Sequence, residues 1–178
     1  AEASNLTECL AVDFAALMQC TLPSLGPQAL ASMHAASGEG ITRRMALAAR
    51  LLLAENGTRD LAALSRHPSD TVRGWACFMV GASEGLSLSD RLALIRPLAD
   101  DPHFGVREWA WLAMRTTIAA QLEAAIAALV PLTAEPSERL RRFASEATRP
   151  RGVWCTHLAS LRQAPEQALM LLEPLKAD

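Results

Sequence analysis

The sequence predicts an all-α fold in which pairs of helices stack into an α-solenoid, a superhelix with a concave binding face. Alanine and leucine dominate a chain that lacks tyrosine and contains only 4% aromatic residues, which favours helices packed through small side chains. Apolar residues recur at helical spacing. Prolines recur every 34 residues, at Pro68, Pro102 and Pro136, and such a period is typical of stacked helix pairs.

The composition predicts one folded domain over residues 1–178. Hydrophobic residues make up 51% of the chain and charged residues 20%, which excludes an intrinsically disordered protein. The net charge of -2 does not indicate a nucleic-acid binder, although a local basic patch would. The four cysteines and four histidines lack metal-ligand spacing, so we expect no metal, no cofactor and a reduced, cytoplasmic chain.

Residues 1–57 are expected to form N-terminal helices. Helical patterns cover residues 6–22 and 42–56, whereas residues 23–40 contain a loop rich in glycine, serine and proline. The first residues have neither a basic region nor a long apolar run, so we expect no signal peptide. No part of the chain reaches the roughly 18 unbroken apolar residues of a membrane helix, so no membrane partner is expected.

From residue 58 onward the chain divides into repeats, each with a turn followed by a second helix. Three segments align without gaps, beginning at His67, Asp101 and Glu135: HPSDTVRGWACFMVGA, DPHFGVREWAWLAMRT and EPSERLRRFASEATRP. The turn followed by Val-Arg or Leu-Arg resembles HEAT repeats. We therefore predict HEAT-like repeats over residues 58–178, in a chain that we expect to continue beyond Asp178.

Helical periodicity assigns one face of each second helix to the core, at i, i+3, i+4 and i+7. The core residues are Val72, Trp75, Ala76 and Met79, then Val106, Trp109, Ala110 and Ala113, then Leu140, Phe143, Ala144 and Ala147. The opposite faces carry Gly74, Cys77 and Gly81, then Glu108, Trp111 and Arg115, then Arg142, Ser145 and Arg149. In a solenoid such faces usually line the concave surface. An exposed tryptophan among arginines would suit a DNA backbone, and a solvated face with ion pairs is the alternative.

Glu146 is unusual because its sister helices carry Phe78 and Leu112 at the same position. This position lies on the flank between the core and the concave face, so the carboxylate is expected to be half-buried. Either it pairs with Arg142 and Arg149 at i−4 and i+3, or it is held at the edge of a binding groove. Periodicity leaves both interpretations open.

Arginine recurs once per repeat, at Arg73, Arg107 and Arg141. This repetition favours a structural role, in which the side chain ties one repeat to the next, over contact with phosphate. The tryptophans Trp75 and Trp109 are assigned to the core rather than to binding by their place in the apolar stripe.

The third repeat resembles a known enzyme family. The segment LRRFASEATRPRGVW, from Leu140 to Trp154, is similar to the corresponding pattern of bacterial alkylpurine DNA glycosylases built from HEAT-like repeats, the AlkC/AlkD superfamily, and especially its AlkC branch. The likeness is dense from Glu135 to Asp178 and continues as a repeat pattern back to Leu6. It implies a monomeric DNA repair enzyme that needs no cofactor and removes purines alkylated at N3 or N7 from double-stranded DNA.

The resemblance also implies roles for residues. Glu146 would stabilise the oxocarbenium-like sugar and orient the attacking water, and Trp154 would lie beside the cationic base. Where the AlkC pattern has a glutamate before F-x-V-R this chain has His103, which could bind phosphate or act as a base. The candidate catalytic residues are Glu146, Trp154, Glu108 and His103, and the candidate DNA-binding residues are Trp111, Arg115, Arg142, Arg149 and Arg151.

Three functional hypotheses follow from these observations. The first is an alkylpurine DNA glycosylase that acts in base excision repair. The second is a catalytically inactive relative that binds DNA through the same groove, which the histidine at position 103 favours. The third is a HEAT-repeat scaffold that binds a protein partner, which the net charge of -2 favours.

Overall fold

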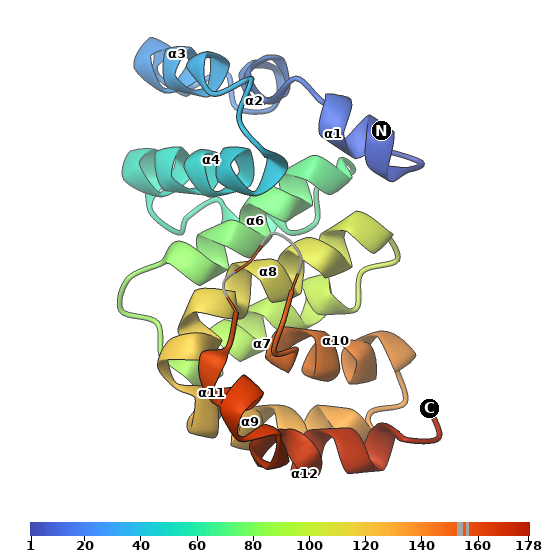
Figure 1. The fold of residues 1–178 in the computed structure, drawn as a ribbon. Coiled ribbons are helices and arrows are strands. Elements are labelled where there is room, and N and C mark those ends of the chain that lie inside the picture. Colours follow the sequence, from blue (N-terminus) through green and yellow to red (C-terminus); the bar gives the residue numbers. More distant parts are fainter. Residues whose placement is uncertain (153–154, 156) are drawn as a thin grey trace. The chain divides into compact units, whose positions relative to one another are not determined.

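The computed structural model describes residues 1–152, 155 and 157–178, and Figure 1 shows that the described chain is built from helices. The described residues form twelve α-helices and three short 3-10 helices, with no strand among them, which confirms the predicted all-α solenoid class. They divide into two compact units, residues 1–84 and residues 85–178. No helix in this part of the chain has the length and apolar character needed to span a membrane.

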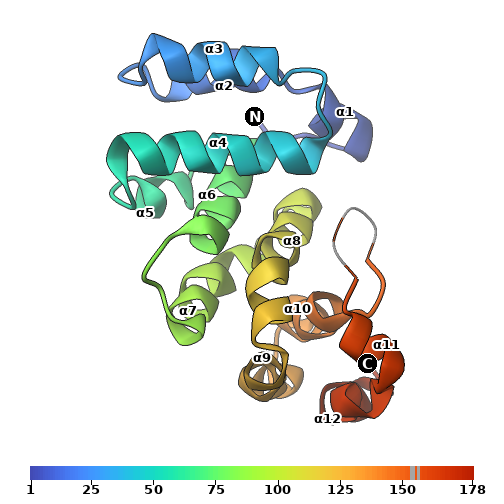
Figure 2. The ribbon, with the colours of Figure 1, turned by 60° about the vertical axis from the view of Figure 1, so that its left-hand side comes forward.

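The first unit contains α1 (Leu6–Ala11), α2 (Phe14–Thr21), α3 (Pro27–Ala35), α4 (Ile41–Asn56), α5 (Leu61–Leu64) and α6 (Asp70–Ala82). Figures 1 and 2 show α2 beside α3, and α4 packs along α6. The helical pattern predicted over residues 6–22 is broken because the Asp13 side chain caps α2, accepting a hydrogen bond from the Ala16 N–H at 3.0 Å. Residues 23–40, which were expected to contain a loop, include α3, whose first residue, Pro27, has a backbone suited to a helix start.

The second unit contains α7 (Leu88–Ala99), α8 (Phe104–Ala120), α9 (Leu122–Leu129), η1 (Val130–Ala134), α10 (Glu138–Thr148), α11 (Ala159–Gln163), η2 (Pro165–Ala168), α12 (Leu169–Leu172) and η3 (Glu173–Leu175). A capping box between Ser87 and Asp90 starts α7. Helix α8 packs against both α7 and α10. The second helices of two consecutive repeats therefore lie side by side.

The predicted core positions of the second helices are all buried, each with 9% or less of its surface exposed. This confirms the assignment of Trp75 and Trp109 to the core. Within the first unit the Trp75 ring meets the Phe14 ring edge to face, with 5.8 Å between centroids. Gly74 and Cys77, on the side of α6 opposite the core stripe, are not exposed as on a concave face, because every residue from Asp70 to Val80 is buried.

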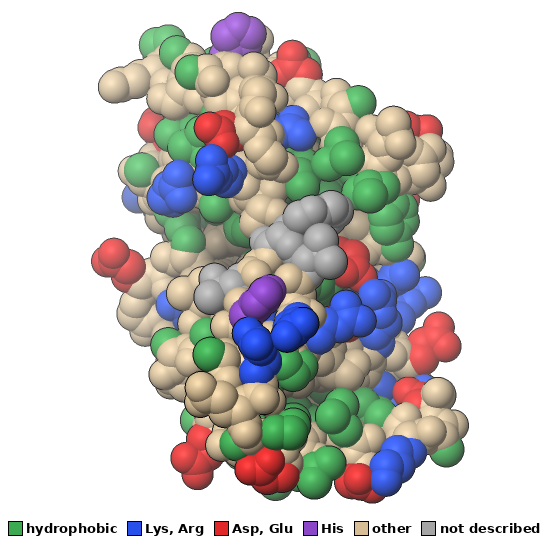
Figure 3. All heavy atoms as spheres, viewed as in Figure 1, with side chains coloured by type: hydrophobic (Ala, Val, Ile, Leu, Met, Phe, Trp, Pro, Cys, Tyr) green, Lys and Arg blue, Asp and Glu red, His purple; other side chains and the backbone are tan. Residues whose placement is uncertain are grey.

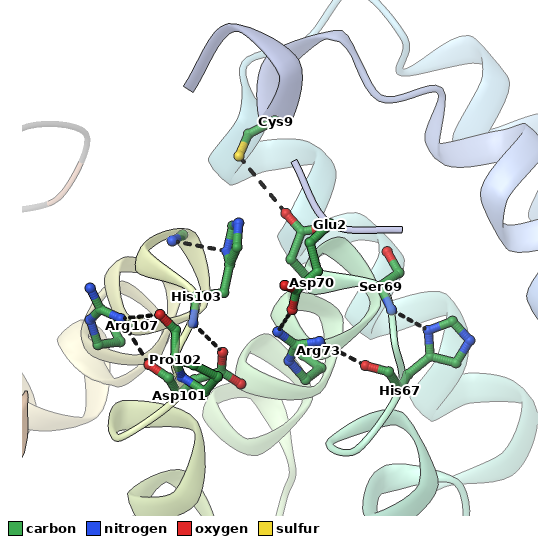
Figure 4. Close-up of polar contacts among 11 residues, drawn as sticks. Glu2, Cys9, His67, Ser69, Asp70, Arg73, Asp101, Pro102, His103 and Arg107 are labelled. Carbon is green, nitrogen blue, oxygen red and sulfur yellow. Dashed lines mark hydrogen bonds and ion pairs between the residues drawn. The ribbon is translucent and has the colours of Figure 1, made fainter. Parts of the chain in front are cut away.

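One arginine in each repeat fastens the turn that opens that repeat. These turn arginines donate a hydrogen bond of 2.8 Å to the backbone carbonyl six residues earlier: Arg73 to His67, Arg107 to Asp101, and Arg141 to Glu135. Figure 4 shows the first two of these bonds. The predicted structural role is confirmed, but these bonds close the turn within one repeat rather than tying it to the next. The reason is that the side chain extends back along its own helix toward the turn.

All four cysteines are free, and Cys9 is fully buried in α1. Its sulfur lies 3.9 Å from an Asp70 carboxylate oxygen in the same unit (Figure 4). Burial, followed by the negative charge of Asp70, raises the pKa of the Cys9 thiol from 9.0 to about 11.

We expect iodoacetamide at pH 8 to alkylate the exposed Cys20 and to leave Cys9 unmodified in the folded protein, because the thiolate is the reactive form. Mass mapping of peptides from native protein and from protein alkylated in urea would measure both sites. Equal rates of alkylation at Cys9 and Cys20 in the native protein would contradict the burial and the raised pKa.

Candidate functional site

Glu146 lies near the end of α10 and has 13% of its side chain exposed. Its Oε1 atom is 3.8 Å from Arg142 Nη2, and its Oε2 atom is 3.2 Å from Arg149 Nη1. Glu146 is thus mostly buried, as its flank position predicted, and it pairs with both arginines, which is one of the two interpretations that periodicity left open. Both arginines are about half exposed, so the carboxylate lies beneath a cationic surface.

Glu108 connects this group to the preceding repeat. It stands 34 residues before Arg142, and its Oε1 atom accepts a hydrogen bond of 2.6 Å from Arg142 Nη2. Its Oε2 atom accepts one of 2.8 Å from the Trp111 indole N–H. Because α8 packs on α10, these side chains form a continuous series, which we call the α8–α10 cluster: Trp111, Glu108, Arg142, Glu146 and Arg149.

Two residues assigned to an exposed DNA-binding face are buried instead. Trp111 has 5% of its surface exposed; the residue lines a pocket together with Phe143, and its indole N–H donates to Glu108. The expectation of an exposed tryptophan is therefore wrong. Trp111 can support the cluster, but it does not offer its ring to a partner.

Arg115 has only 2% of its surface exposed. Its guanidinium donates hydrogen bonds to the carbonyl oxygens of Ala147, at 3.0 Å, and of Arg149. These carbonyls belong to the last turn of α10 and the residue after it, where a helix leaves carbonyls without partners. The expected exposure of Arg115 is wrong: this arginine is buried and holds the end of α10 that carries Glu146.

His103 is buried at the start of α8 and acts as the N-cap of that helix. Its Nδ1 atom accepts a hydrogen bond of 3.2 Å from the Gly105 N–H, and its own backbone N–H donates to Asp101 Oδ1 at 2.8 Å (Figure 4). The equivalent positions in the other repeats, Ser69 and Ser137, are also N-caps. The alignment could have indicated this role, which places the imidazole at a helix start rather than among the residues of the cluster.

A small pocket adjoins the cluster, with a volume of about 10 Å³, which is room for about one water molecule. It is lined by Ala99, Arg107, Trp111, Arg139, Arg142, Phe143 and Glu146. Arg107 and Arg139 were not among the predicted site residues. The turn spacing could have identified Arg107, and the position of Arg139 two residues after an N-cap could have placed it near the same turn.

Positive charge is concentrated along and after α10. Residues 139–151 contain five arginines and one glutamate, a net charge of +4, whereas residues 85–178 contain eleven basic and eleven acidic side chains. Figure 3 shows Lys and Arg side chains gathered over and beside α10. Arg151 is exposed after the end of this helix, and Trp154 lies outside the described residues. A local basic surface therefore exists on a unit without net charge.

One oxygen of Glu146 retains the capacity to accept a hydrogen bond. The Oε2 atom is buried, and no described group donates a well-directed hydrogen bond to it, although Arg149 lies within ion-pair distance. Buried carboxylate oxygens are usually hydrogen-bonded.

Within the described part of the chain, no group of three or more His, Cys, Asp or Glu side chains is arranged to hold a metal ion.

Comparison with known proteins identifies one family. The model for HEAT repeats matches residues 59–148, which is just over half of the chain and includes the turns and second helices of all three repeats. No curated protein matches the chain, and no solved structure does either.

Proposed function

The chain belongs to the HEAT repeat family, and we propose that it is a DNA glycosylase that releases purines alkylated at N3 or N7. A HEAT fold is shared by proteins with many activities, so the support for this proposal has to come from the site. The resemblance of residues 140–154 to alkylpurine glycosylases supplies the reaction class. The α8–α10 cluster supplies groups suited to it.

Double-stranded DNA would bind on the basic surface of α10. Arg142 and Arg149 are about half exposed, and Arg151 is exposed, so all three can reach phosphates. Contacts of this kind give affinity without sequence preference, which suits an enzyme that must act wherever a lesion occurs.

The reaction needs few groups because an alkylated purine already carries a positive charge. The bond between the sugar C1′ and the base nitrogen breaks, and its electron pair neutralises the base. Water adds to C1′ and releases a proton. Glu146 would stabilise the developing positive charge on the sugar and orient that water through its Oε2 atom. The pocket holds about one water molecule and no purine, so the base would remain on the exposed side of the arginines.

The observation that carries this proposal is the mostly buried carboxylate of Glu146 beneath a cationic surface. Its Oε2 atom accepts no well-directed hydrogen bond from the described residues. A different observation favours an inactive DNA-binding relative. Arg142 and Arg149 partly neutralise Glu146, and His103 is engaged as an N-cap rather than supplying a second acid. Both candidates use the same basic surface.

The test is release of 3-methyladenine and 7-methylguanine from methylated duplex DNA, compared with the same DNA without protein. Release above the spontaneous rate would establish the glycosylase. Duplex binding without release would identify an inactive DNA-binding relative. Absence of both would leave a HEAT scaffold for a protein partner.

Binding to duplex DNA is expected to weaken as salt rises, with a slope of log K against log salt of about −3, from about 0.9 for each of three phosphate contacts. Fluorescence anisotropy at NaCl concentrations from about 50 to 300 mM would measure the slope, because counterion release dominates the salt dependence of binding in this range. Arg151→Gln should reduce its magnitude by about 1. A slope near zero would contradict DNA binding by this surface.

A further inference from the structure

The turn arginines differ at the edge of the guanidinium that does not face the turn. In the first repeat Arg73 pairs with Glu2. In the third repeat Arg141 binds Asp178 in a bidentate manner, through Nε at 2.8 and 2.9 Å and through Nη2. In the second repeat Arg107 has no ion pair with any carboxylate of the described residues, and its hydrogen bonds go to the carbonyls of Asp101 and Pro102. Two of three equivalent guanidinium groups therefore bind an acid, and the third does not.

Arg107 is instead surrounded by further arginines. It lines the small pocket together with Arg139 and Arg142. Burial lowers the pKa of Arg107, and the positive charges of Arg139 and Arg142 lower it further, while Asp101 and Glu108 act in the opposite direction. Three arginines and one carboxylate, that of Glu146, thus line the same pocket.

Arg139 and Arg142 are held in place by hydrogen bonds that occupy only some of their N–H donors. Arg139 Nη1 donates to the Asp100 carbonyl at 3.1 Å, and Arg142 Nη2 donates to Glu108. Each guanidinium has five N–H donors in a fixed plane, so donors remain for an added ligand. Arginine binds tetrahedral oxyanions and carboxylates with the same bidentate geometry.

We propose that Arg107, Arg139 and Arg142 form a phosphate-binding site at the mouth of this pocket. The phosphate would take on Arg107 the position that Glu2 and Asp178 take on the other two turn arginines. The link to DNA rests on the proposed function: the ligand would be a backbone phosphodiester close to Glu146, which lines the same pocket. The anion site itself does not depend on excision.

Titration with inorganic phosphate at pH 7, followed by NMR of the arginine Nε–Hε groups, tests this site. At constant ionic strength, we expect saturable shifts of Arg107, Arg139 and Arg142. The other turn arginines, Arg73 and Arg141, serve as controls within the same spectrum because neither lines the pocket and each binds a carboxylate at the guanidinium edge that Arg107 leaves for the phosphate. Equal shifts across all arginines, or no saturable shift, would overturn the proposal.

Matched variants distinguish phosphate binding at this site from a general effect of positive charge on the protein surface. Arg139→Gln leaves the turn bonds of Arg107 intact and should weaken phosphate binding about tenfold, the scale of one charge-assisted hydrogen bond. Arg162→Gln removes an exposed arginine of α11 and should change nothing. Equal affinity in the wild type and Arg139→Gln would overturn the site.

A short unmodified duplex identifies the source of the phosphate. If the site holds a backbone phosphodiester, the duplex should displace inorganic phosphate and shift the same three arginines. If phosphate binds but the duplex neither competes nor shifts them, the assignment to DNA is overturned. Because this measurement uses undamaged DNA, it is independent of whether the protein releases alkylated bases.

Discussion

Replacing Glu146 with glutamine is expected to reduce protein-dependent release of 3-methyladenine at least about a hundredfold, the scale of a key electrostatic group in a preorganised site. Glutamine keeps the shape of the side chain but removes its negative charge. The variant can no longer stabilise an oxocarbenium-like sugar, and its amide is a poorer acceptor for the attacking water. Single-turnover release from methylated duplex DNA, corrected for spontaneous depurination, measures the effect.

Binding of undamaged duplex should be unchanged or slightly tighter in Glu146→Gln, because the change removes a negative charge next to Arg142 and Arg149. Glu138→Gln is the matched control, since Glu138 is exposed in the first turn of the same helix. It should release base at the wild-type rate. If Glu146→Gln also released base within about threefold of the wild type, far below the effect of a key electrostatic group, Glu146 would be only an ion-pair partner of the two arginines.

The sequence was sufficient to predict the repeat and the residues that form its core. A spacing of 34 residues between prolines placed the turns, and apolar spacing placed residues such as Trp75 and Phe143 in the interior. These predictions succeed because burial of a helix face depends on a periodic pattern, which a single chain displays in full. The flank position of Glu146 also predicted its burial, whereas its pairing with Arg142 and Arg149 was one of two interpretations that periodicity left open.

The outer faces of the helices were less predictable. Periodicity states which residues share a face, but not whether the neighbouring helix covers that face. Trp111 and Arg115 lie on the side of α8 opposite the core stripe, yet both are buried. Trp111 donates a hydrogen bond within its own helix, and Arg115 donates to carbonyls 32 and 34 residues further along the chain. Arg107 was missed in the site for a related reason, since the pocket it lines depends on how α8 packs against α10.

Replacing the buried Arg115 is expected to have a second large effect, on the stability of the fold. Arg115→Met is expected to lower the free energy of unfolding by about 3 kcal/mol, because the carbonyls of Ala147 and Arg149 lose their donors and an unpaired buried carbonyl costs about 1–3 kcal/mol. Urea unfolding followed by circular dichroism would measure the change.

Arg149→Gln is the matched comparison because Arg149 is about half exposed on the same part of α10. It should lower stability by about 1 kcal/mol or less, because it removes one partly exposed ion pair and no hydrogen bond to a carbonyl, and it should reduce the salt slope of duplex binding by about 1. Arg115→Met should leave that slope unchanged, because a guanidinium buried against backbone carbonyls does not reach a phosphate. A stable Arg115→Met variant with a smaller salt slope would mean that Arg115 contacts DNA directly. The two arginines therefore distinguish a residue that positions the end of α10 from one that binds at its surface.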